Sequence, residues 1–584
     1  MFGPFTAYVR PYRIRILLGL VCIALAQAAS ARIPLLVGQA VNALDLDATR
    51  EILLQGIQAD VLLVVGLALA MALCNYVMRR LMGTAAVRLE YDIRTAYFAH
   101  LLSLPLAYFQ KQLTGDLMSR ATNDLNAVRI FFIYGVRGVF ETILTLLFSI
   151  ALMLYLDWRL TLIILIPMPI FSFIIIRMAA LVHTRFKAIQ ELFGHISTFI
   201  QENLAGIRVV KSYVQGQAQL AAFEELNHAY LEKNNHLIRT HAVYQPLIYM
   251  IASIGLGLNL CFGGRAVING TMAIGDFVAF NIYLTQFIRP IAYMGWVIDR
   301  FQRALVSMHR INEVLEVEPQ IRNLPASSTA DRQITGQIQF CGLTFAYENG
   351  PNVLHDINLD LPAGTTLGIL GRVGAGKTTL ARLVPRLIQA APGQVLIDGI
   401  PIEDWPLEKI RAAIGYVSQT PFLFSDSVRS NIAFGATEQQ EELAKIIEAA
   451  QEAQLHQDID TFEDGFDTVV GERGVTLSGG QKQRTTLARA LIRRPRILIL
   501  DDSLSAVDTQ TEEAILGHLR RIMAGRTTLI IAHRISTLRH ADRIIVLDEG
   551  RISEAGSHQQ LLQLDGFYAD LYRRQQLAAE LETL

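Results

Sequence analysis

The stretch Gly371-Arg372-Val373-Gly374-Ala375-Gly376-Lys377-Thr378-Thr379 decides the fold of the second half of this 584-residue chain. It fits the pattern GxxxxGK[ST] and directly follows an apolar, strand-like segment. Glycines at these positions let backbone N–H groups surround phosphate oxygens where a helix begins. Lys377 is then expected to reach the β- and γ-phosphates of a nucleotide, and the Thr378 hydroxyl to bind Mg²⁺. The stretch predicts a nucleotide-binding domain.

Short β-like runs alternate with helical patterns on both sides of this loop, which predicts an α/β fold. The run Ile497–Leu500 is wholly apolar and ends in Asp501. A buried strand that delivers a carboxylate at its carboxyl end is what Mg²⁺ coordination opposite the loop requires. The other runs are Gln337–Phe340, Thr366–Leu370, Val395–Ile397, Thr528–Ile531 and Arg543–Leu547.

The first half of the chain has a different character. Hydrophobic residues make up 52% of the sequence and charged residues only 18%, and the long apolar runs all lie before residue 300. A membrane span needs about 20 mostly apolar residues. Six stretches qualify: 16–40, 57–78, 132–156, 158–181, 244–267 and 273–298. The predicted fold class is therefore an α-helical six-span transmembrane domain with long cytosolic helical extensions, joined to an α/β P-loop domain.

Basic residues indicate how the spans are oriented. Arg and Lys gather before the first span and in the segments after the second and fourth, whereas the three opposite loops contribute only Arg50, Arg159 and Arg265. By the positive-inside rule, both termini and the soluble domain face the cytosol, beneath an inner or plasma membrane. The predicted domains are residues 1–310 (transmembrane), 311–332 (linker), 333–575 (nucleotide-binding) and 576–584 (tail).

The two cytosolic segments between spans carry apolar residues at helical spacing, so the spans are expected to continue as helices below the membrane. Their turns, near Tyr108–Asp116 and Lys211–Gln217, are expected to contact the soluble domain. Within the third span, Arg137 and Glu141 are four residues apart and share one helix face. The favoured interpretation is a mutual structural pair, and the alternative is a substrate or proton contact that lines a cavity.

Leu477-Ser478-Gly479-Gly480-Gln481, which precedes Asp501 by twenty residues, resembles the signature sequence of ABC transporters. Four other features occur along the chain in the same order as in that family, namely Gln419, Gly471–Gly474, Ser505–Asp508 and His533. Together with the six spans, they make the chain similar to the half-transporters of the ABC exporter class. The resemblance implies that Tyr347 stacks on adenine and that Ser478–Gln481 clasp the nucleotide of the opposite subunit. It also implies that Gln419 contacts Mg²⁺ and the attacking water, and that His533 contacts the γ-phosphate.

One position departs from the pattern of the family. The residue after the Mg²⁺ aspartate is usually a glutamate that acts as general base or positions the attacking water, and here it is Asp502. Aspartate is one methylene shorter, and a base must lie within about 2.6–3.2 Å of the proton that it takes. Lys377, Gln419 and His533 would complete the catalytic set. The resemblance is therefore to the weak-site subunit of heterodimeric ABC multidrug exporters, and the alternative is a homodimer in which Asp502 suffices.

The resemblance implies ATP-driven export of a hydrophobic or amphipathic substrate by alternating access, with ATP and Mg²⁺ as cofactors. The implied partners are a second ABC half-transporter, the lipid bilayer, and a hydrophobic small molecule or lipid. The alternatives are a homodimeric lipid flippase or drug exporter, and an ATP-gated regulatory or channel-like protein that does not pump. An importer is disfavoured, because importers of the superfamily usually keep the two domains on separate chains. The net charge of −1 gives no support for a nucleic-acid partner.

Overall fold

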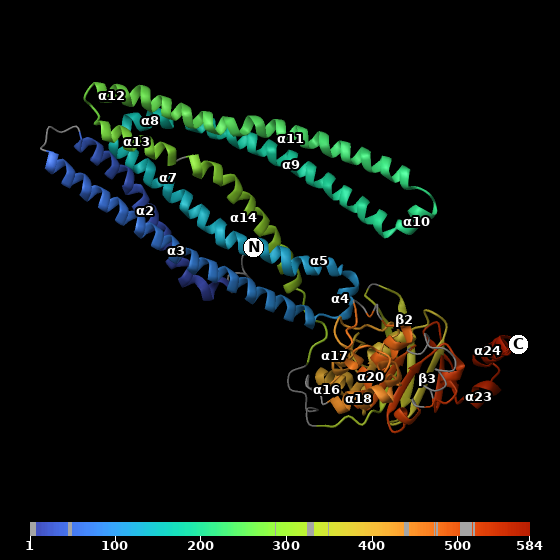
Figure 1. The fold of residues 1–584 in the computed structure, drawn as a ribbon. Helices are drawn as coiled ribbons and strands as arrows, with labels where there is room; N and C mark the ends of the chain where they lie inside the picture. Colours follow the sequence, from blue (N-terminus) through green and yellow to red (C-terminus); the bar gives the residue numbers. More distant parts are fainter. Residues whose placement is uncertain are drawn as a thin grey trace. The chain divides into compact units, whose positions relative to one another are not determined.

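The chain forms two compact units in a computed structural model that describes residues 8–44, 50–286, 288–323, 332–348, 350–436, 443–471, 474, 477–502, 517 and 520–583. The first unit comprises Met1–Leu102 and Thr114–Val317, and the second comprises Ser103–Leu113 and Glu318–Leu584 (Figure 1). The short helix α4 (Leu106–Lys111) therefore belongs to the second unit. Of the two turns expected to contact the soluble domain, Tyr108–Asp116 is divided between the units after Leu113, and Lys211–Gln217 lie in the first unit.

The described residues of the first unit form helices joined by short turns, and several of the helices are long. At 54 residues, α3 is about 80 Å long at 1.5 Å per residue, far more than a bilayer core requires. The predicted helical extensions are thus present. The helices are α2 (Arg13–Ala43), α3 (Arg50–Ser103), α5 (Thr114–Ser119), α6 (Leu125–Ile130), α7 (Val136–Leu156), α8 (Trp158–Leu165), α9 (Met168–Ala205), α10 (Ile207–Ser212), α11 (Gly216–Leu258), α12 (Gly264–Ile268), α13 (Ile274–Gln286) and α14 (Ile288–Leu315).

In the part of the first unit that the structure describes, three π-helical turns interrupt this series: η2 (Arg120–Asp124), η3 (Phe131–Gly135) and η4 (Asn259–Gly263). Within the described residues, three helices are long and apolar enough to cross a membrane, namely Arg10–Ala43, Gly56–Ser103 and Thr114–Leu156. A shorter apolar helix spans Ser253–Ile268. Of the other predicted spans, 158–181 falls on α8 and α9, 244–267 falls on α11, η4 and α12, and 273–298 falls on α13 and α14, so the count of six stays a prediction.

Local chemistry explains where several of these helices begin and meet. The Asp157 carboxylate accepts hydrogen bonds from the N–H groups of Arg159 and Leu160 at 2.8 and 3.1 Å, which caps α8. Small residues bring α2 and α13 close together. A Cβ on Gly38 would lie 2.6 Å from the Gly275 carbonyl oxygen, so this contact requires glycine.

Within its described residues, the second unit contains two sheets. A four-stranded antiparallel sheet has the order β2-β1-β4-β5, and a six-stranded sheet has the order β10-β9-β3-β8-β7-β6 with a parallel centre. The strands are β1 (Ile338–Ala346), β2 (Asn352–Leu361), β3 (Thr366–Gly371), β4 (Val395–Ile397), β5 (Ile400–Pro401), β6 (Ile414–Val417), β7 (Ile497–Asp501), β8 (Thr527–Ile531), β9 (Arg543–Asp548) and β10 (Arg551–Gly556). All six predicted strands are confirmed.

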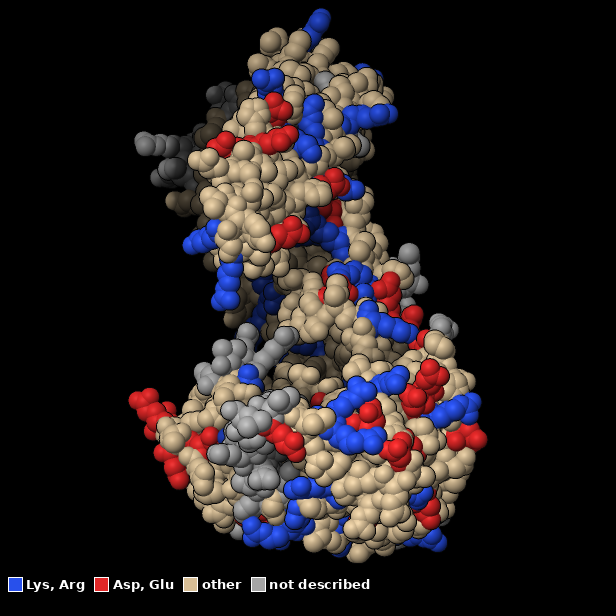
Figure 2. All heavy atoms as spheres, turned by 90° about the vertical axis from the view of Figure 1, so that its right-hand side faces the viewer, with Lys and Arg blue, Asp and Glu red and all other residues tan. Residues whose placement is uncertain are grey.

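The parallel centre of the larger sheet brings the functional loops to one edge. Every residue of β3, β7 and β8 is buried, as expected for strands covered on both faces. Around them lie the helices α15 (Lys377–Leu383), α16 (Leu407–Ala413), α17 (Val428–Ala433), α18 (Leu443–Glu452), α19 (His456–Ile459), α20 (Gly479–Leu491), α22 (Ile535–Leu538), α23 (His558–Gln563) and α24 (Phe567–Thr583). On the face of this unit seen in Figure 2, basic and acidic side chains are interspersed.

Candidate nucleotide-binding site

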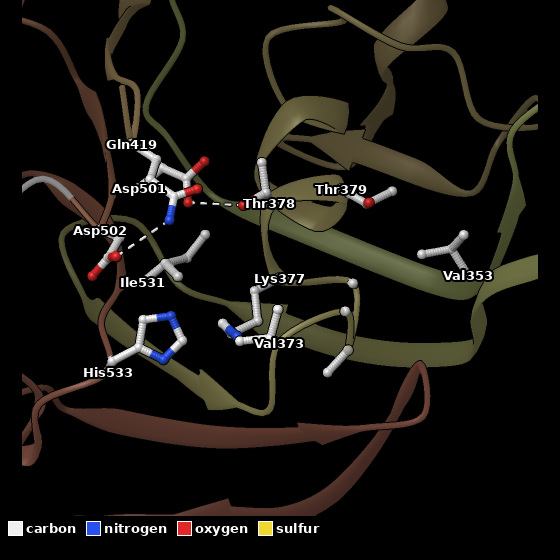
Figure 3. Close-up of a pocket in the computed structure, with 13 residues that line it drawn as sticks. Val353, Val373, Lys377, Thr378, Thr379, Gln419, Asp501, Asp502, Ile531 and His533 are labelled. Atoms are coloured by element: carbon white, nitrogen blue, oxygen red, sulfur yellow. Dashed lines mark hydrogen bonds between the residues drawn. The ribbon is translucent and has the colours of Figure 1, made fainter. Parts of the chain in front are cut away.

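A cleft of about 340 Å³ opens at the carboxyl ends of β3 and β7, which is where ligands bind in α/β sheets. Most of the predicted site residues line it (Figure 3). The lining consists of Val353, Val373, Gly374, Ala375, Gly376, Lys377, Thr378, Thr379, Gln419, Asp501, Asp502, Ile531 and His533.

The loop between β3 and α15 has a backbone that only glycine adopts easily. Gly374 and Gly376 have φ values of 86° and 94°, in the left-handed region. A Cβ on Gly376 would also lie 2.7 Å from Cδ2 of Leu354, so a side chain would collide with β2 as well as strain the loop. The glycines thus keep the backbone free to approach a phosphate.

Lys377 is folded into this loop. Its side-chain nitrogen Nζ donates hydrogen bonds of 2.8 Å to the carbonyl oxygens of Gly371 and Arg372, and the residue is only 7% exposed. Burial lowers the pKa of the ammonium group, and the charges of Asp502 and Asp501 act in the opposite direction. Both acceptors are neutral, so a phosphate oxygen that replaced them would form a stronger, charge-assisted bond.

Two oxygen ligands suited to Mg²⁺ lie next to each other. The Thr378 hydroxyl donates a hydrogen bond of 3.0 Å to Oδ1 of Asp501, and Asp501 is 1% exposed (Figure 3). Burial raises the pKa of this carboxyl group, which a bound cation would reverse. Hydroxyl, carboxylate and phosphate oxygens are the donors that Mg²⁺ prefers. The residues present therefore fit the metal.

The groups that would act on the γ-phosphate lie at the opposite side of the cleft. Gln419 donates a hydrogen bond of 3.4 Å from Nε2 to Oδ2 of Asp502, and the His533 ring lies near both Asp502 and Lys377 (Figure 3). Gln575 on α24 holds the segment that carries His533. It donates to the His533 carbonyl oxygen and accepts from the N–H of Ile535, both at 2.9 Å.

Three predicted groups do not line the cleft. Gly371 and Arg372 precede its lining, and their carbonyl oxygens accept the hydrogen bonds of Lys377. Tyr347 lies beside the cleft, with its hydroxyl 3.1 Å from Oγ1 of Thr379. Ser478–Gln481 begin α20, where Ser478 and Gln481 cap the helix reciprocally through bonds of 2.9 and 3.3 Å. Gly471 and Gly474 are described, but Glu472, Arg473 and Ser505–Asp508 lie outside the described residues.

Tyr416 also belongs to the site, although it was not predicted from the sequence, and it donates a hydrogen bond of 3.4 Å to Oδ2 of Asp501. Burial and the adjacent Asp501 charge raise the pKa of Tyr416 to about 12, so the phenol stays neutral and can donate. Tyr416 lies on β6, the strand directly next to β7 in the sheet, and this neighbourhood could not be predicted from a local motif. Val353 and Ile531 were missed for the same reason.

Comparisons with known proteins agree with this geometry. Residues 16–291 match the family model of the ABC transporter transmembrane region, and residues 354–505 match that of the ABC transporter. The chain is 34% identical over 566 residues to an ATP-dependent lipid A-core flippase of Syntrophus aciditrophicus (strain SB), covering 97% of this chain and 93% of the relative. It is 36% identical over 502 residues to a probable multidrug resistance ABC transporter ATP-binding/permease protein of Bacillus subtilis (strain 168), covering 86% and 85%.

A solved structure of a bacterial Atm1-family ABC exporter with ATP bound is similar to nearly the whole chain. The TM-score is 0.79 at 27% identity, covering 96% of this chain and 98% of that one. The second unit is therefore an ATP-binding ATPase domain, and the first is a membrane-spanning export domain to which ATP hydrolysis is coupled. On its sequence, its site and its relatives, the chain belongs to the ABC transporter family, as an exporter of the multidrug and lipid-flippase type.

Proposed function

We propose that this chain is the weak-site half of a heterodimeric exporter, which binds ATP with Mg²⁺ and moves a hydrophobic or amphipathic substrate out of the inner membrane by alternating access. Both termini and the ATPase domain would face the cytosol. The observation that carries the proposal is that Asp502, which lines the cleft directly after Asp501, has a side chain one methylene shorter than the glutamate usual in the family. Lys377, Thr378 and Asp501 are all in place, so ATP binding would be intact.

The signature residues support the need for a second chain. Ser478–Gln481 are well ordered by their capping box, yet they are not among the residues that line the cleft. Gln481 also bonds Asp458 at 3.2 Å, and Arg484 binds the same carboxylate at 2.6 and 3.1 Å, which fixes the start of α20. A rigid signature helix that does not serve its own site is suited to complete the site of a partner.

The test is Mg-ATP hydrolysis by the purified chain alone in lipid nanodiscs, with its mass measured in parallel. We expect ATP binding with little turnover, and we expect Asp502→Glu to raise turnover by at least about tenfold, since a well-placed general base contributes about 10²–10⁴-fold. Asp570→Glu, which lengthens an exposed carboxylate on α24, is the control and should change nothing. Brisk turnover by a dimer of the unmodified chain, unaffected by Asp502→Glu, would instead establish a homodimer in which Asp502 suffices.

A further inference from the structure

Four polar side chains follow one face of α7 at intervals of four residues: Arg137, Glu141, Thr145 and Ser149. The helix contacts α2, α13 and α14 (Figure 1). The last two, Thr145 and Ser149, form hydrogen bonds with side-chain amides of neighbouring helices. Oγ1 of Thr145 lies 3.0 Å from Oε1 of Gln27, and Oγ of Ser149 lies 3.4 Å from Oε1 of Gln286. These two contacts join helices to one another, as polar groups in membranes often do.

The first two polar residues, Arg137 and Glu141, bond to each other instead of to a neighbouring helix. Arg137 donates a hydrogen bond of 3.1 Å from Nε to Oε2 of Glu141, and the two side chains remain 21% and 37% exposed. Counted from Leu156 at 1.5 Å per residue, Glu141 lies about 22 Å along α7, within a hydrocarbon core about 30 Å thick. Charged groups inside the hydrocarbon core are costly when they face lipid, and they usually face the interior of a helix bundle or a water-filled cavity. The open side of this pair is therefore suited to a cavity or a ligand rather than to lipid.

Aromatic rings stand beside the pair. The Tyr293 ring packs against α7 at Gly138, the residue after Arg137, where an added Cβ would lie 2.5 Å from Cε1 of the ring. Trp296 continues this surface, with its ring centroid 5.0 Å from Tyr293 and 6.2 Å from Tyr134. Tyr134 and Tyr293 are 47% and 38% exposed. The glycine thus places an open aromatic wall next to the two charges.

The charges select the chemistry of a ligand. Because the pair is neutral overall, a ligand with a single charge is attracted by one member and repelled by the other. A zwitterion gains from both, since its anion can bind the guanidinium and its cation can bind the carboxylate and the faces of the rings. We propose that Arg137, Glu141, Tyr134, Tyr293 and Trp296 bind the headgroup of a zwitterionic amphiphile, which rests on the proposed export function and specifies its substrate class.

The test measures equilibrium binding without nucleotide, so it does not depend on hydrolysis or pumping. The full chain is placed in nanodiscs of phosphatidylglycerol, which supply no competing zwitterion. Three probes share one acyl chain with a terminal fluorophore and differ in the headgroup: phosphocholine, trimethylammonium alone, or phosphate alone. We expect phosphocholine to bind at least about tenfold more tightly than either singly charged probe.

Variants then test the residues. Arg137→Gln/Glu141→Gln should abolish the preference for phosphocholine. Arg137→Glu/Glu141→Arg keeps both charges and should keep most of the preference, which separates recognition from a loss of folding. Lys187→Gln/Glu191→Gln removes an exposed pair of the same spacing on α9 and should have no effect.

The inference is overturned by equal affinity for all three headgroups, by no binding of phosphocholine to the unmodified chain, or by a preference that survives in the double glutamine variant. The last result would mean that the pair is only structural. Failure of the export function would be seen separately, as binding with the expected preference but no ATP-dependent uptake of phosphocholine amphiphile by inside-out vesicles.

Discussion

Tyr347 makes two separable contributions beside the nucleotide cleft. Its ring packs edge-on against Phe345 at 5.1 Å, and its hydroxyl bonds to Thr379. Stacking of a base on an aromatic ring contributes about 1–3 kcal/mol. We therefore expect Tyr347→Ala to weaken ATP binding roughly tenfold or more, whereas Tyr347→Phe keeps the ring and should bind ATP almost normally. The measurement is equilibrium binding of ATP to the purified chain, and equal losses in both variants would mean that the hydroxyl, not the ring, matters.

How far single residues could be predicted depended on whether a local pattern fixes them. The glycine loop, Lys377, Thr378 and Asp501 lie within or directly after a strand, so their positions follow from sequence alone, and the structure brings them together with Gln419 and His533. Tyr416 comes from a neighbouring strand and has no motif of its own, so its contact with Asp501 depends on strand order. Asp116, for which the sequence predicts a contact with the soluble domain, pairs with Arg120 and Arg310, and no local motif indicates the pair with Arg310.

Among the elements, α5, η2 and α14 are joined by a set of ion pairs. Arg310 on α14 pairs with Asp116 and, at 2.8 Å, with Asp124, which also accepts a hydrogen bond of 2.7 Å from Ser307. Arg120 bonds Asp116 at 2.8 Å and Glu313 at 3.0 Å. Because Asp124 is only 8% exposed, loss of Arg310 leaves a buried charge without its ion-pair partner.

We expect Arg310→Gln to lower the free energy of unfolding by about 1–3 kcal/mol. Arg303→Gln is the matched control on the same helix. Arg303 pairs with Asp299 at 3.0 Å but is 57% exposed, and such surface pairs contribute little. The apparent melting temperature of each purified variant measures the effect. Equal melting temperatures for the two variants would show that the Arg310 contacts do not stabilise the helices.

The Asp116 carboxyl makes this set sensitive to acid. The hydrogen bond from Arg120 holds its pKa below the ordinary value, and the charges of Arg120 and Arg310 act in the same direction. Stability from a lowered carboxyl pKa is present above the unfolded value of about 3.9 and is lost as pH falls through the folded value. The difference in melting temperature between the unmodified chain and Asp116→Asn should thus be constant from about pH 7 to 5 and shrink below about pH 4. A difference that shrinks between pH 7 and 6 would implicate another group.

The bounds of helices and strands could be predicted where the hydrophobic periodicity of the sequence is continuous. They could be predicted less well where the backbone departs from regular α-helical geometry. The strands and the long helices α3, α9 and α11 follow from sequence patterns. The three π-helical turns were not foreseen, because an i→i+5 turn adds one residue without a signature of its own. The fourth predicted span is split into α8 and α9 around Pro167, since proline removes a backbone donor and clashes with the preceding turn.

In the molecule as a whole, the chain passes between the two units at residues 102–103, 113–114 and 317–318. Glu348, next to Tyr347, bonds to both parts of the second unit that begin or end at these points, namely Ser103–Leu113 and the start of Glu318–Leu584. It pairs with Lys111 on α4, and it accepts a hydrogen bond of 3.1 Å from Gln320. The hydrogen bond from Lys111 lowers the pKa of Glu348 most, and the hydrogen bond from Gln320 lowers it further. The carboxylate is therefore charged at neutral pH. Residues continuous with the export domain thus meet beside Tyr347.

Because both partners are exposed, this pair adds little to stability, and a change in it should affect the coupling of hydrolysis to transport instead. We expect Lys111→Glu or Glu348→Lys to lower the number of substrate molecules transported per ATP hydrolysed by about fivefold, which is at the lower end of typical coupling between sites. The melting temperature should not fall. The exchange Lys111→Glu/Glu348→Lys restores an attractive pair and should recover most of the loss. The measurement is transport and hydrolysis side by side in inside-out vesicles that contain the complete transporter. If the double exchange transports no better than the single variants, the two residues act separately, and α4 does not signal through Glu348.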